Sequence, residues 1–359
     1  MFSSSDTSTI LARAPLRLSF AGGGTDLPAY YERYGGLVLS TTISRSAYAL
    51  LAPGDYDEVH IVSSNYRTVH TDRRDSSLSL PWAVIRAMRV ERGASIFLSS
   101  DVPPGTGLGS SSATAVALIT AVAAWRGRTF SPMDAAELAS RVEIVDLGQS
   151  IGKQDQYAAA HGGINLFAFG ADGVRVTPVT VSDEVRRGLE RHLTLYFTGS
   201  TRQAGTILKE QHARIAHGES RTMESLHALK EYVAPMYAAL QAGDYTTMGA
   251  LLHEAWQLKR RVSSGISTGA IDLAYDTARA AGALGGKITG AGGGGFLLLL
   301  TPPHAQDAVD TALRPLGLRR MAFTLEPRGA HTIGIGTEGQ CDTYDTMVLP
   351  PVGVGYSYA

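Results

Sequence analysis

The chain has 359 residues, of which 44% are hydrophobic and 18% charged, and its formal net charge is −1. This length and composition predict a globular protein with one large core or two moderate ones, and the length favours two domains. The near-neutral charge, with lysines and arginines scattered along the chain, argues against nucleic acid as a partner. The single cysteine, Cys341, excludes an internal disulfide framework and is typical of a reducing compartment.

The ends and apolar segments of the chain argue against export and membrane insertion. Residues 1–8 are polar and lack the basic-then-apolar pattern of a signal peptide. The longest apolar run, residues 113–125, is shorter than the roughly 20 residues that span a bilayer. We therefore expect a cytoplasmic protein with no membrane contact, and a homodimer is left open. The 40 glycines cluster in loops, which is typical of an enzyme that acts on small molecules.

The first half of the chain reads mainly as strands, with two helices. Hydrophobic and polar side chains alternate along residues 10–21, which are also rich in β-formers, so this segment predicts a strand. A second helix, at 133–147, has Ser131 as its N-cap and Pro132 at its first position. The other elements predicted here are one or two strands at 37–51, a strand at 95–99, a helix at 113–125, a hairpin of 162–169 with 174–181, and a buried strand at 193–197.

The second half is richer in helices. Residues 246–261 place apolar side chains on one face at helical spacing. Further helices are predicted at 203–216, 222–240, 270–281 and 305–316, and strands at 296–301 and 322–325. We predict an N-terminal domain at 1–190, a C-terminal domain at 191–336, and a tail at 337–359 that has no periodic pattern.

Residues 103–113 are the most informative segment and read Pro-Pro-Gly-Thr-Gly-Leu-Gly-Ser-Ser-Ser-Ala. Glycines let the backbone approach a ligand closely, and a helix N-terminus offers unpaired N–H donors and a partial positive charge. The segment therefore predicts a phosphate-binding site. It contains no Gly-Lys-Ser/Thr, and its spacing differs from Gly-x-Gly-x-x-Gly, so it is neither the common P-loop nor the dinucleotide fingerprint.

Three glycine-rich segments, in order, resemble the motifs of the GHMP kinases, the superfamily of galactokinase, homoserine kinase and mevalonate kinase. They are residues 13–26, 103–113 and 287–296, and the resemblance spans about 10–335. It implies an α+β fold of two lobes, a ribosomal protein S5 domain 2-like N-terminal domain and a ferredoxin-like C-terminal domain, with the active site between them. It also implies ATP and Mg²⁺.

Three segments narrow the resemblance to the D-glycero-D-manno-heptose 7-phosphate kinases, which phosphorylate the anomeric C1 hydroxyl of a sugar phosphate. They are Gly22-Gly-Gly-Thr-Asp26, the segment 152–160, and His253-x-x-Trp256-x-x-Lys259. The kinase half of bifunctional fucokinases carries similar motifs. The alternatives are therefore a kinase for another anomeric hydroxyl, such as that of fucose or a non-phosphorylated heptose, and a non-catalytic sugar and ATP sensor.

The resemblance assigns nucleotide and metal contacts. Ser111 and Glu143 match the superfamily's Mg²⁺ ligands. The serines could instead only cap the helix, and Asp146, one turn on, could replace Glu143. The nucleotide phosphates are expected on Pro104, Gly105, Thr106, Gly107, Leu108, Gly109, Ser110, Ser111 and Ser112.

Asp155 matches the superfamily's catalytic aspartate, which accepts or orients the proton of the sugar hydroxyl. Lys153, two residues away, could keep Asp155 ionised. Arg17, in the first strand, aligns with the arginine beside the transferred phosphate. The bland alternative is that residues 153–156 form only a polar turn.

Sugar contacts are expected near the first and third motifs. Galactokinases have Gly-Glu-His-Thr-Asp where this chain has Gly-Gly-Gly-Thr-Asp, which argues against galactose and suits a longer heptose. A phosphate already on the substrate needs a cation, for which Arg202 and Lys259 are the predicted residues and Arg260 and Arg45 further candidates. The other predicted sugar-binding residues are Arg13, Gly23, Gly24, Thr25, Asp26, Gln154, Gly292 and Gly293.

Overall fold

The structure is a computed structural model. It describes residues 9–54, 57–64, 69–70, 78–199, 209–210, 212–215, 217–260 and 265–334. Arg202, the predicted tail 337–359 and much of the predicted helix 203–216 lie outside the described residues.

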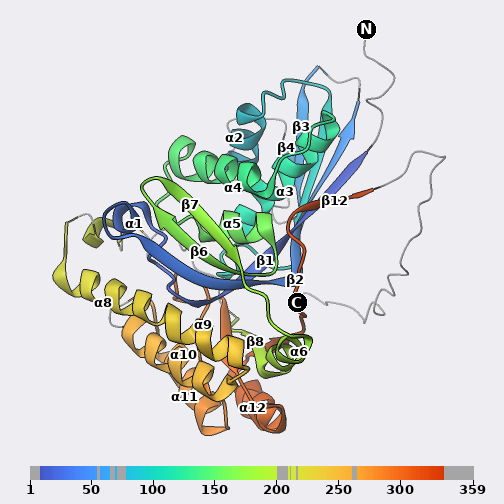
Figure 1. Cartoon of the computed structure of the whole chain (residues 1–359). Coiled ribbons are helices and arrows are strands. Elements are labelled where there is room, and N and C mark those ends of the chain that lie inside the picture. Colours follow the sequence, from blue (N-terminus) through green and yellow to red (C-terminus); the bar gives the residue numbers. More distant parts are fainter. Residues whose placement is uncertain are drawn as a thin grey trace.

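An eight-stranded sheet forms the upper layer in Figure 1. Its long central strand β2 (Gly36–Pro53) pairs with three others along its length, namely β1 (Ile10–Ala21), β5 (Ala94–Ser100) and β6 (Ile164–Gly170). The remaining strands are β3 (Val59–Ser63), β4 (Val69–His70), β7 (Gly173–Pro178) and β12 (His331–Gly334).

Helices cover this sheet and build the main core. α3 (Ser110–Trp125) packs on β1 and β2, and nearly all of its alanine, valine and leucine side chains are buried. Because α3 is apolar all round, it is a central core helix rather than a surface helix. Its neighbouring helices are α2 (Ser79–Ala87), α4 (Pro132–Ser140) and α5 (Gln154–His161), while α1 (Pro28–Tyr34) packs on β6.

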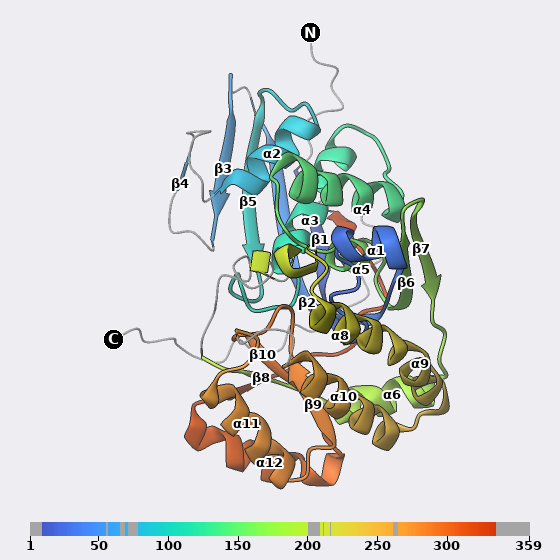
Figure 2. The ribbon, with the colours of Figure 1, turned by 90° about the vertical axis from the view of Figure 1, so that its left-hand side faces the viewer.

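A second, antiparallel sheet of four strands lies below the first (Figures 1 and 2). Its strand order is β11 (Arg319–Met321), β8 (Leu193–Phe197), β10 (Phe296–Leu300), β9 (Gly285–Ile288). β10 is buried on both faces: Leu298 and Leu300 join the main core, whereas Leu297 and Leu299 pack into a second cluster with α11 and α12. The helices of this layer are α6 (Asp183–His192), α8 (Ser220–Glu231), α9 (Val233–Ala242), α10 (Tyr245–Lys259), α11 (Gly269–Ala280) and α12 (Gln306–Leu313).

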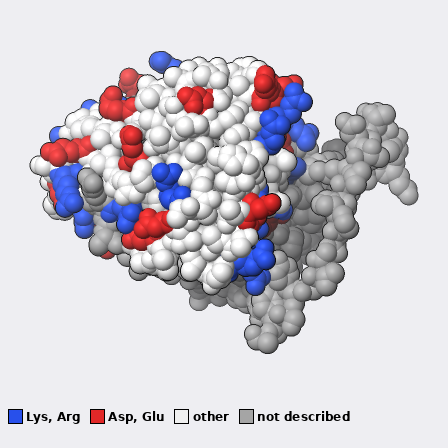
Figure 3. Space-filling model, turned by 90° about the horizontal axis from the view of Figure 1, so that it is seen from below, with Lys and Arg blue, Asp and Glu red and all other residues white. Residues whose placement is uncertain are grey.

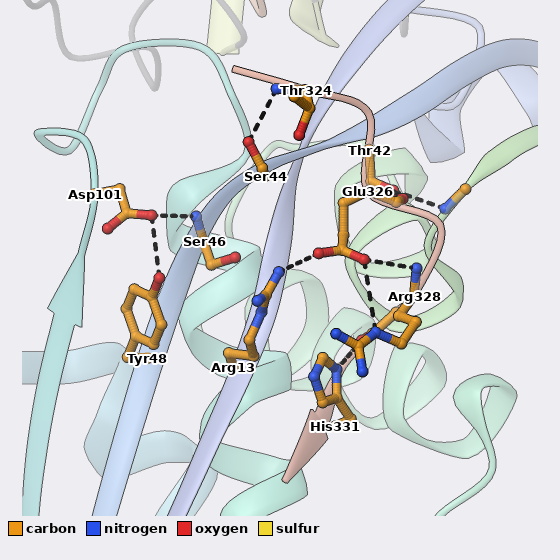
Figure 4. Close-up of polar contacts among 12 residues, drawn as sticks. Arg13, Thr42, Ser44, Ser46, Tyr48, Asp101, Thr324, Glu326, Arg328 and His331 are labelled. Carbon is orange, nitrogen blue, oxygen red and sulfur yellow. Dashed lines mark hydrogen bonds and ion pairs between the residues drawn. The ribbon is translucent and has the colours of Figure 1, made fainter. Parts of the chain in front are cut away.

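After the second sheet the chain returns to the first. Residues 322–330, here called the return segment, run along β2, and β12 then pairs with β1. Glu326 of the return segment forms a buried ion pair with Arg13 (Figure 4). Thr42 Oγ1 donates a hydrogen bond of 2.6 Å to the carbonyl of Glu326. The predicted boundary near residue 190 falls between the strands of the two sheets and stays a prediction.

Several predicted elements need correction. The strand predicted at 322–325 is wrong, because the last strand of the second sheet is β11 and Leu325 makes only an isolated bridge to Ile43. The helix predicted at 222–240 is two helices that meet at Tyr232, since Pro235 has no N–H to continue the ladder. The helix predicted at 133–147 ends as α4 and continues as a π-helical turn over Arg141–Asp146.

The surface carries charges of both signs. Seen from below, Figure 3 shows acidic and basic side chains interspersed, with neither sign gathered into a continuous field. Among the described residues, no helix has the length and apolar character needed to cross a bilayer.

Candidate active site

A cavity of about 310 Å³ lies where the two layers meet. It is bounded by the end of β1, the glycine-rich loop before α3, the start of α5, the end of α10 and the loop after β9. The predicted site residues that line it are Arg17, Gly23, Gly24, Asp26, Gly105, Gly107, Gly109, Ser110, Ser111, Ser112, Glu143, Gln154, Asp155 and Lys259.

The glycine-rich loop turns through three glycines with positive φ. Gly105, Gly107 and Gly109 have φ of 76°, 79° and 76°. A Cβ on Gly107 would lie 2.4 Å from the carbonyl oxygen of Thr289, so only glycine fits there. Gly109 is the N-cap of α3 and no side chain caps the helix, which leaves its first N–H groups facing the cavity for an anion.

Three residues predicted in this loop do not line the cavity, and two of them, Thr106 and Leu108, hold the loop instead. Thr106 is buried and its Oγ1 donates to the carbonyl of Pro103 at 3.0 Å. Leu108 accepts the N–H of Arg17 at 3.1 Å through its carbonyl oxygen. Pro104 is exposed beside them.

Asp155 and Arg17 form the charged centre of the cavity. Arg17 Nε donates to Asp155 Oδ1 at 2.8 Å and Nη2 to Oδ2 at 2.9 Å, a two-point pair that fixes the carboxylate. Arg17 Nη1 also donates to the carbonyl of Gly107 at 2.6 Å. A Cβ on Gly109 would lie 3.0 Å from Asp155 Oδ2, so the carboxylate stands directly against the phosphate loop.

Lys153 is placed away from Asp155. Its ammonium lies 3.5 Å from Glu137 Oε2 and 5.9 Å from the ring centroid of Tyr31. The charge beside Asp155 is therefore supplied by Arg17, which is 138 residues away in sequence.

Glu143 and Ser111 meet at another wall. Glu143 is fully buried on the π-helical turn. Its Oε1 accepts from Ser111 Oγ at 3.2 Å and its Oε2 from Gln156 Nε2 at 2.6 Å. Burial raises the pKa of Glu143 to about 7. The alternative ligand, Asp146, is exposed and lies 3.9 Å from Arg141.

The Asp26 carboxylate is held at the start of α5. It accepts the N–H groups of Gly24 at 3.0 Å and Gln154 at 3.2 Å, and also the Gln154 side chain at 3.2 Å. Burial first, and then the charge of Asp155, raise the pKa of Asp26. A Cβ on Gly152 would lie 1.8 Å from Asp26 Oδ2, so this arrangement requires glycine at 152.

Several predicted sugar-binding residues instead support the walls. Thr25 Oγ1 donates to the carbonyl of Gly22 within the turn and accepts the N–H of Leu37, which ties the turn to β2. Gly293 donates to the carbonyl of Ile266 at 2.8 Å, and a Cβ on Gly292 would also meet Ile266. Neither glycine lines the cavity.

The predicted basic residues also divide into those that line the cavity and those that are engaged elsewhere. Arg13 is engaged by Glu326 on the return segment, outside the cavity. Arg45 donates to the carbonyl of Ala322, and Arg260 lies 2.9 Å from Asp272. Of these candidates, Lys259 alone lines the cavity within the described residues.

The cavity also contains residues that were not among the predicted site residues, although several of them lie in the segments that carry the family resemblance. They are Ser19, Leu27, Gln149, Ser150, Ile151, Gly152, Lys209, Lys287, Gly290 and Ala291. Lys287 is buried within β9, where a lysine is costly without a purpose, but no strand was predicted over these residues, so its burial was not apparent from the sequence.

Comparison with known proteins identifies the family of the chain. The family model described as GHMP kinases N terminal domain matches residues 79–163, and that described as GHMP kinases C terminal matches residues 236–315. A D-glycero-alpha-D-manno-heptose 7-phosphate kinase of Campylobacter jejuni is 33% identical over 318 residues, which cover 85% of this chain and 93% of that protein. The chain belongs to the GHMP kinases.

Solved structures of this family share the fold. A D-glycero-D-manno-heptose 1-phosphate kinase from Bacteriodes thetaiotaomicron has a TM-score of 0.77 and 30% identity, covering 91% of this chain and all of that chain (100%). A Lactococcus lactis galactokinase complexed with galactose has a TM-score of 0.73 at 17% identity, covering 91% and 95%. The predicted two-lobed α+β fold is thereby confirmed, and the protein is an ATP-dependent kinase.

Proposed function

We propose that this kinase transfers the γ-phosphate of ATP to the anomeric C1 hydroxyl of D-glycero-D-manno-heptose 7-phosphate, giving the 1,7-bisphosphate and ADP. The observation that carries the proposal is the Arg17–Asp155 pair, which holds a carboxylate against the phosphate loop. The identity with the heptose 7-phosphate kinase supports the choice of substrate.

The residues of the cavity divide the work of phosphoryl transfer, which depends mainly on positioning and charge neutralisation. Backbone N–H groups at the start of α3 bind the β- and γ-phosphates. Asp155 orients the C1 hydroxyl and accepts its proton as the sugar oxygen bonds to the γ-phosphorus. The bond between that phosphorus and the β,γ-bridging oxygen breaks, and ADP leaves with this oxygen. Arg17 offsets the charge that develops on the transferred group.

Ser111 and Glu143 fit a magnesium ion. Both offer oxygen, the ligand type that Mg²⁺ prefers, and Mg²⁺ commonly takes one or two carboxylates together with phosphates. Glu143 is a buried carboxylate without a basic partner among the described residues, which a cation would compensate. When bound, the ion would neutralise charge on the β- and γ-phosphates.

A Glu143→Gln variant tests the metal assignment. Replacing the carboxylate by an amide removes a charged ligand at nearly constant shape, so affinity for Mn²⁺ as a Mg²⁺ substitute should fall by about tenfold or more. Electron paramagnetic resonance of Mn²⁺ with bound ADP measures this without turnover. Wild-type affinity in the variant would remove Glu143 from the metal site.

A panel of sugars in an ADP-release assay tests the substrate. We expect the highest kcat/KM with heptose 7-phosphate, ahead of heptose, fucose and galactose. A bifunctional L-fucokinase from Bacteroides fragilis is 26% identical over 336 residues, covering 81% of this chain but 34% of that protein, so fucose is the second candidate. A preference for fucose, or equal activity on heptose without its phosphate, would overturn the substrate. ATP binding with no ADP release for any sugar would favour the sensor.

A further inference from the structure

Three lysines line the cavity within the described residues, namely Lys209, Lys259 and Lys287, and the last two come from the helix and sheet elements of the lower layer. Lys259 is the last residue of α10, and Lys287 lies in β9 with 7% of its surface exposed. Each ammonium has one backbone acceptor. Lys259 Nζ donates to the carbonyl of Gly290 at 2.6 Å, and Lys287 Nζ to the carbonyl of Phe20 at 3.4 Å.

These ammonium groups differ from Arg17 in having no carboxylate partner. Among the described residues, no acidic side chain lies within ion-pair distance of Lys259 or Lys287. Asp26 is the acid whose charge acts on Lys259, but both of its oxygens already accept hydrogen bonds. An ammonium has three donors, so each lysine has donors left for a ligand.

The electrostatics of the pair favour an anion. Burial and the nearby positive charges lower the pKa of both lysines, that of Lys259 to about 8. Lys259 acts on Lys287, and Arg17 acts on both. Holding the buried Lys287 near a second, partly buried cation is costly, and an anion bound by both would offset that cost.

The position of the pair identifies which anion it fits. The seat for the nucleotide phosphates is on the α3 wall, with Ser110 to Ser112 and Glu143. Lys287 instead reaches the carbonyl of Phe20, directly before the Gly22–Asp26 turn that presents Asp26. The charge of Asp26 also acts on Lys259, so both lysines lie toward the Asp26 turn, where the acceptor is expected.

We propose that Lys259 and Lys287 bind the phosphate that the acceptor already carries and so select a sugar phosphate over a neutral sugar. This assignment rests on the proposed function and adds the specificity-determining residues to it. Ammonium groups suit the role, because a point charge can bind the phosphate at the flexible end of the sugar whatever the orientation of its oxygens.

The test compares two acceptors across lysine variants at saturating ATP. Lys287→Met and Lys259→Met should each lower kcat/KM for heptose 7-phosphate by about tenfold to a hundredfold, the loss expected for a charged contact. The kcat/KM for heptose itself should change by less than about threefold, because heptose carries no phosphate for the lysines to bind. Lys230→Met is the matched control. Lys230 also donates to backbone carbonyls, of Tyr34 and Gly35, but lies outside the cavity.

Thermal unfolding separates this role from a structural one. Removing a buried, unpaired charge should leave the Tm of Lys287→Met equal to or above that of the wild type. A lower Tm, with equal loss on both acceptors, would make the lysine structural and overturn the proposal. Equal loss on both acceptors at unchanged Tm would also overturn it, since the lysines would then act on the transferred phosphoryl group.

A binding measurement keeps the inference separate from the proposed function. If the wild type phosphorylates none of the panel, the proposed substrate fails. The phosphate-binding site proposed at Lys259 and Lys287 is then tested with inorganic phosphate, while a non-hydrolysable ATP analogue and Mg²⁺ occupy the nucleotide loop. Phosphate should raise the Tm of the wild type and not that of Lys287→Met. Equal rises in Tm in both proteins would show that Lys287 does not bind phosphate and would overturn the proposal.

Discussion

At the scale of single residues, the site depends on side chains that the fold brings together from distant segments. That Asp155 and Ser111 line the cavity was predictable because both stand in motifs, and Glu143 because it matches the position of a superfamily metal ligand. The partner of Asp155 was not, because neighbours in sequence suggest Lys153, whereas the sheet and α5 bring Arg17 to it. Lys153 is the N-cap of α5, and its ammonium pairs with Glu137.

Lys287 escaped prediction for a related reason. An isolated lysine before a glycine cluster is usually a solvated turn residue, and only the pairing of β9 with β10 shows it to be buried. Conversely, Arg13 was predicted to bind sugar, but the return segment, which the sequence did not reveal, engages it instead.

The Lys259 pKa predicts a pH dependence. The charged groups that act on it are Arg17, which lowers its pKa, and Asp26, which raises it, and it in turn faces Lys287. Lys259 is protonated below pH about 8 and loses its charge above it. The kcat/KM for heptose 7-phosphate, which reports groups of the free enzyme, should therefore fall as the pH rises through about 8.

A Lys259→Arg variant is the control, because a guanidinium stays charged throughout this range. Its pH–rate profile should lack the fall near 8. Identical profiles for variant and wild type would show that another group titrates there.

At the scale of elements, the helix that carries Glu143 shows what sequence patterns reach and where they stop. The predicted cap was correct: Ser131 and Asp134 form a capping box, and Pro132 is the first helical residue. The π-helical turn was not predicted, because its wider bonding depends on packing against α2 and the cavity. This turn buries Glu143 while Val145 is 72% exposed.

The cap gives a prediction for the stability of this element. Ser131→Ala should lower the free energy of unfolding by about 1 kcal/mol, the usual value of an N-cap side chain. Denaturant titration measures this loss. Since the cap lies a full helix away from Glu143, kcat should stay within about twofold of the wild type. A large loss of kcat at small cost in stability would mean that α4 positions Glu143 directly.

At the scale of the whole molecule, two sheets meet at the cavity and the chain crosses between them twice. The fold class was predictable from three motifs in order, and the family models and solved relatives confirm it. The second crossing, from β11 to β12, was hidden. Its residues were predicted only as a strand at 322–325, which is wrong, and their buried hydrogen bonds to β2 form only in the folded chain.

The Arg13–Glu326 pair tests the importance of this crossing. Both side chains are at most 10% exposed, so Glu326→Gln would leave a buried guanidinium without its counter-charge. We expect a loss of about 3 kcal/mol in the free energy of unfolding. Arg13→Met combined with Glu326→Gln should cost less than the single change, because the orphaned charge is removed.

Activity in the same variants distinguishes stability from binding. Neither residue lines the cavity, so KM for the sugar should stay near the wild-type value wherever the protein is folded. A raised KM would instead support the role in sugar binding predicted from the sequence.

The account depends on Asp155 acting on the acceptor while main-chain N–H groups hold the nucleotide. Asp155→Asn keeps the shape of the side chain but removes the proton acceptor, so kcat should fall by about a hundredfold or more, the usual scale for loss of a general base. Affinity for a non-hydrolysable ATP analogue, measured by titration calorimetry, should stay within about threefold, because the loop binds through its backbone. Wild-type turnover in this variant, or loss of nucleotide binding with it, would contradict the account.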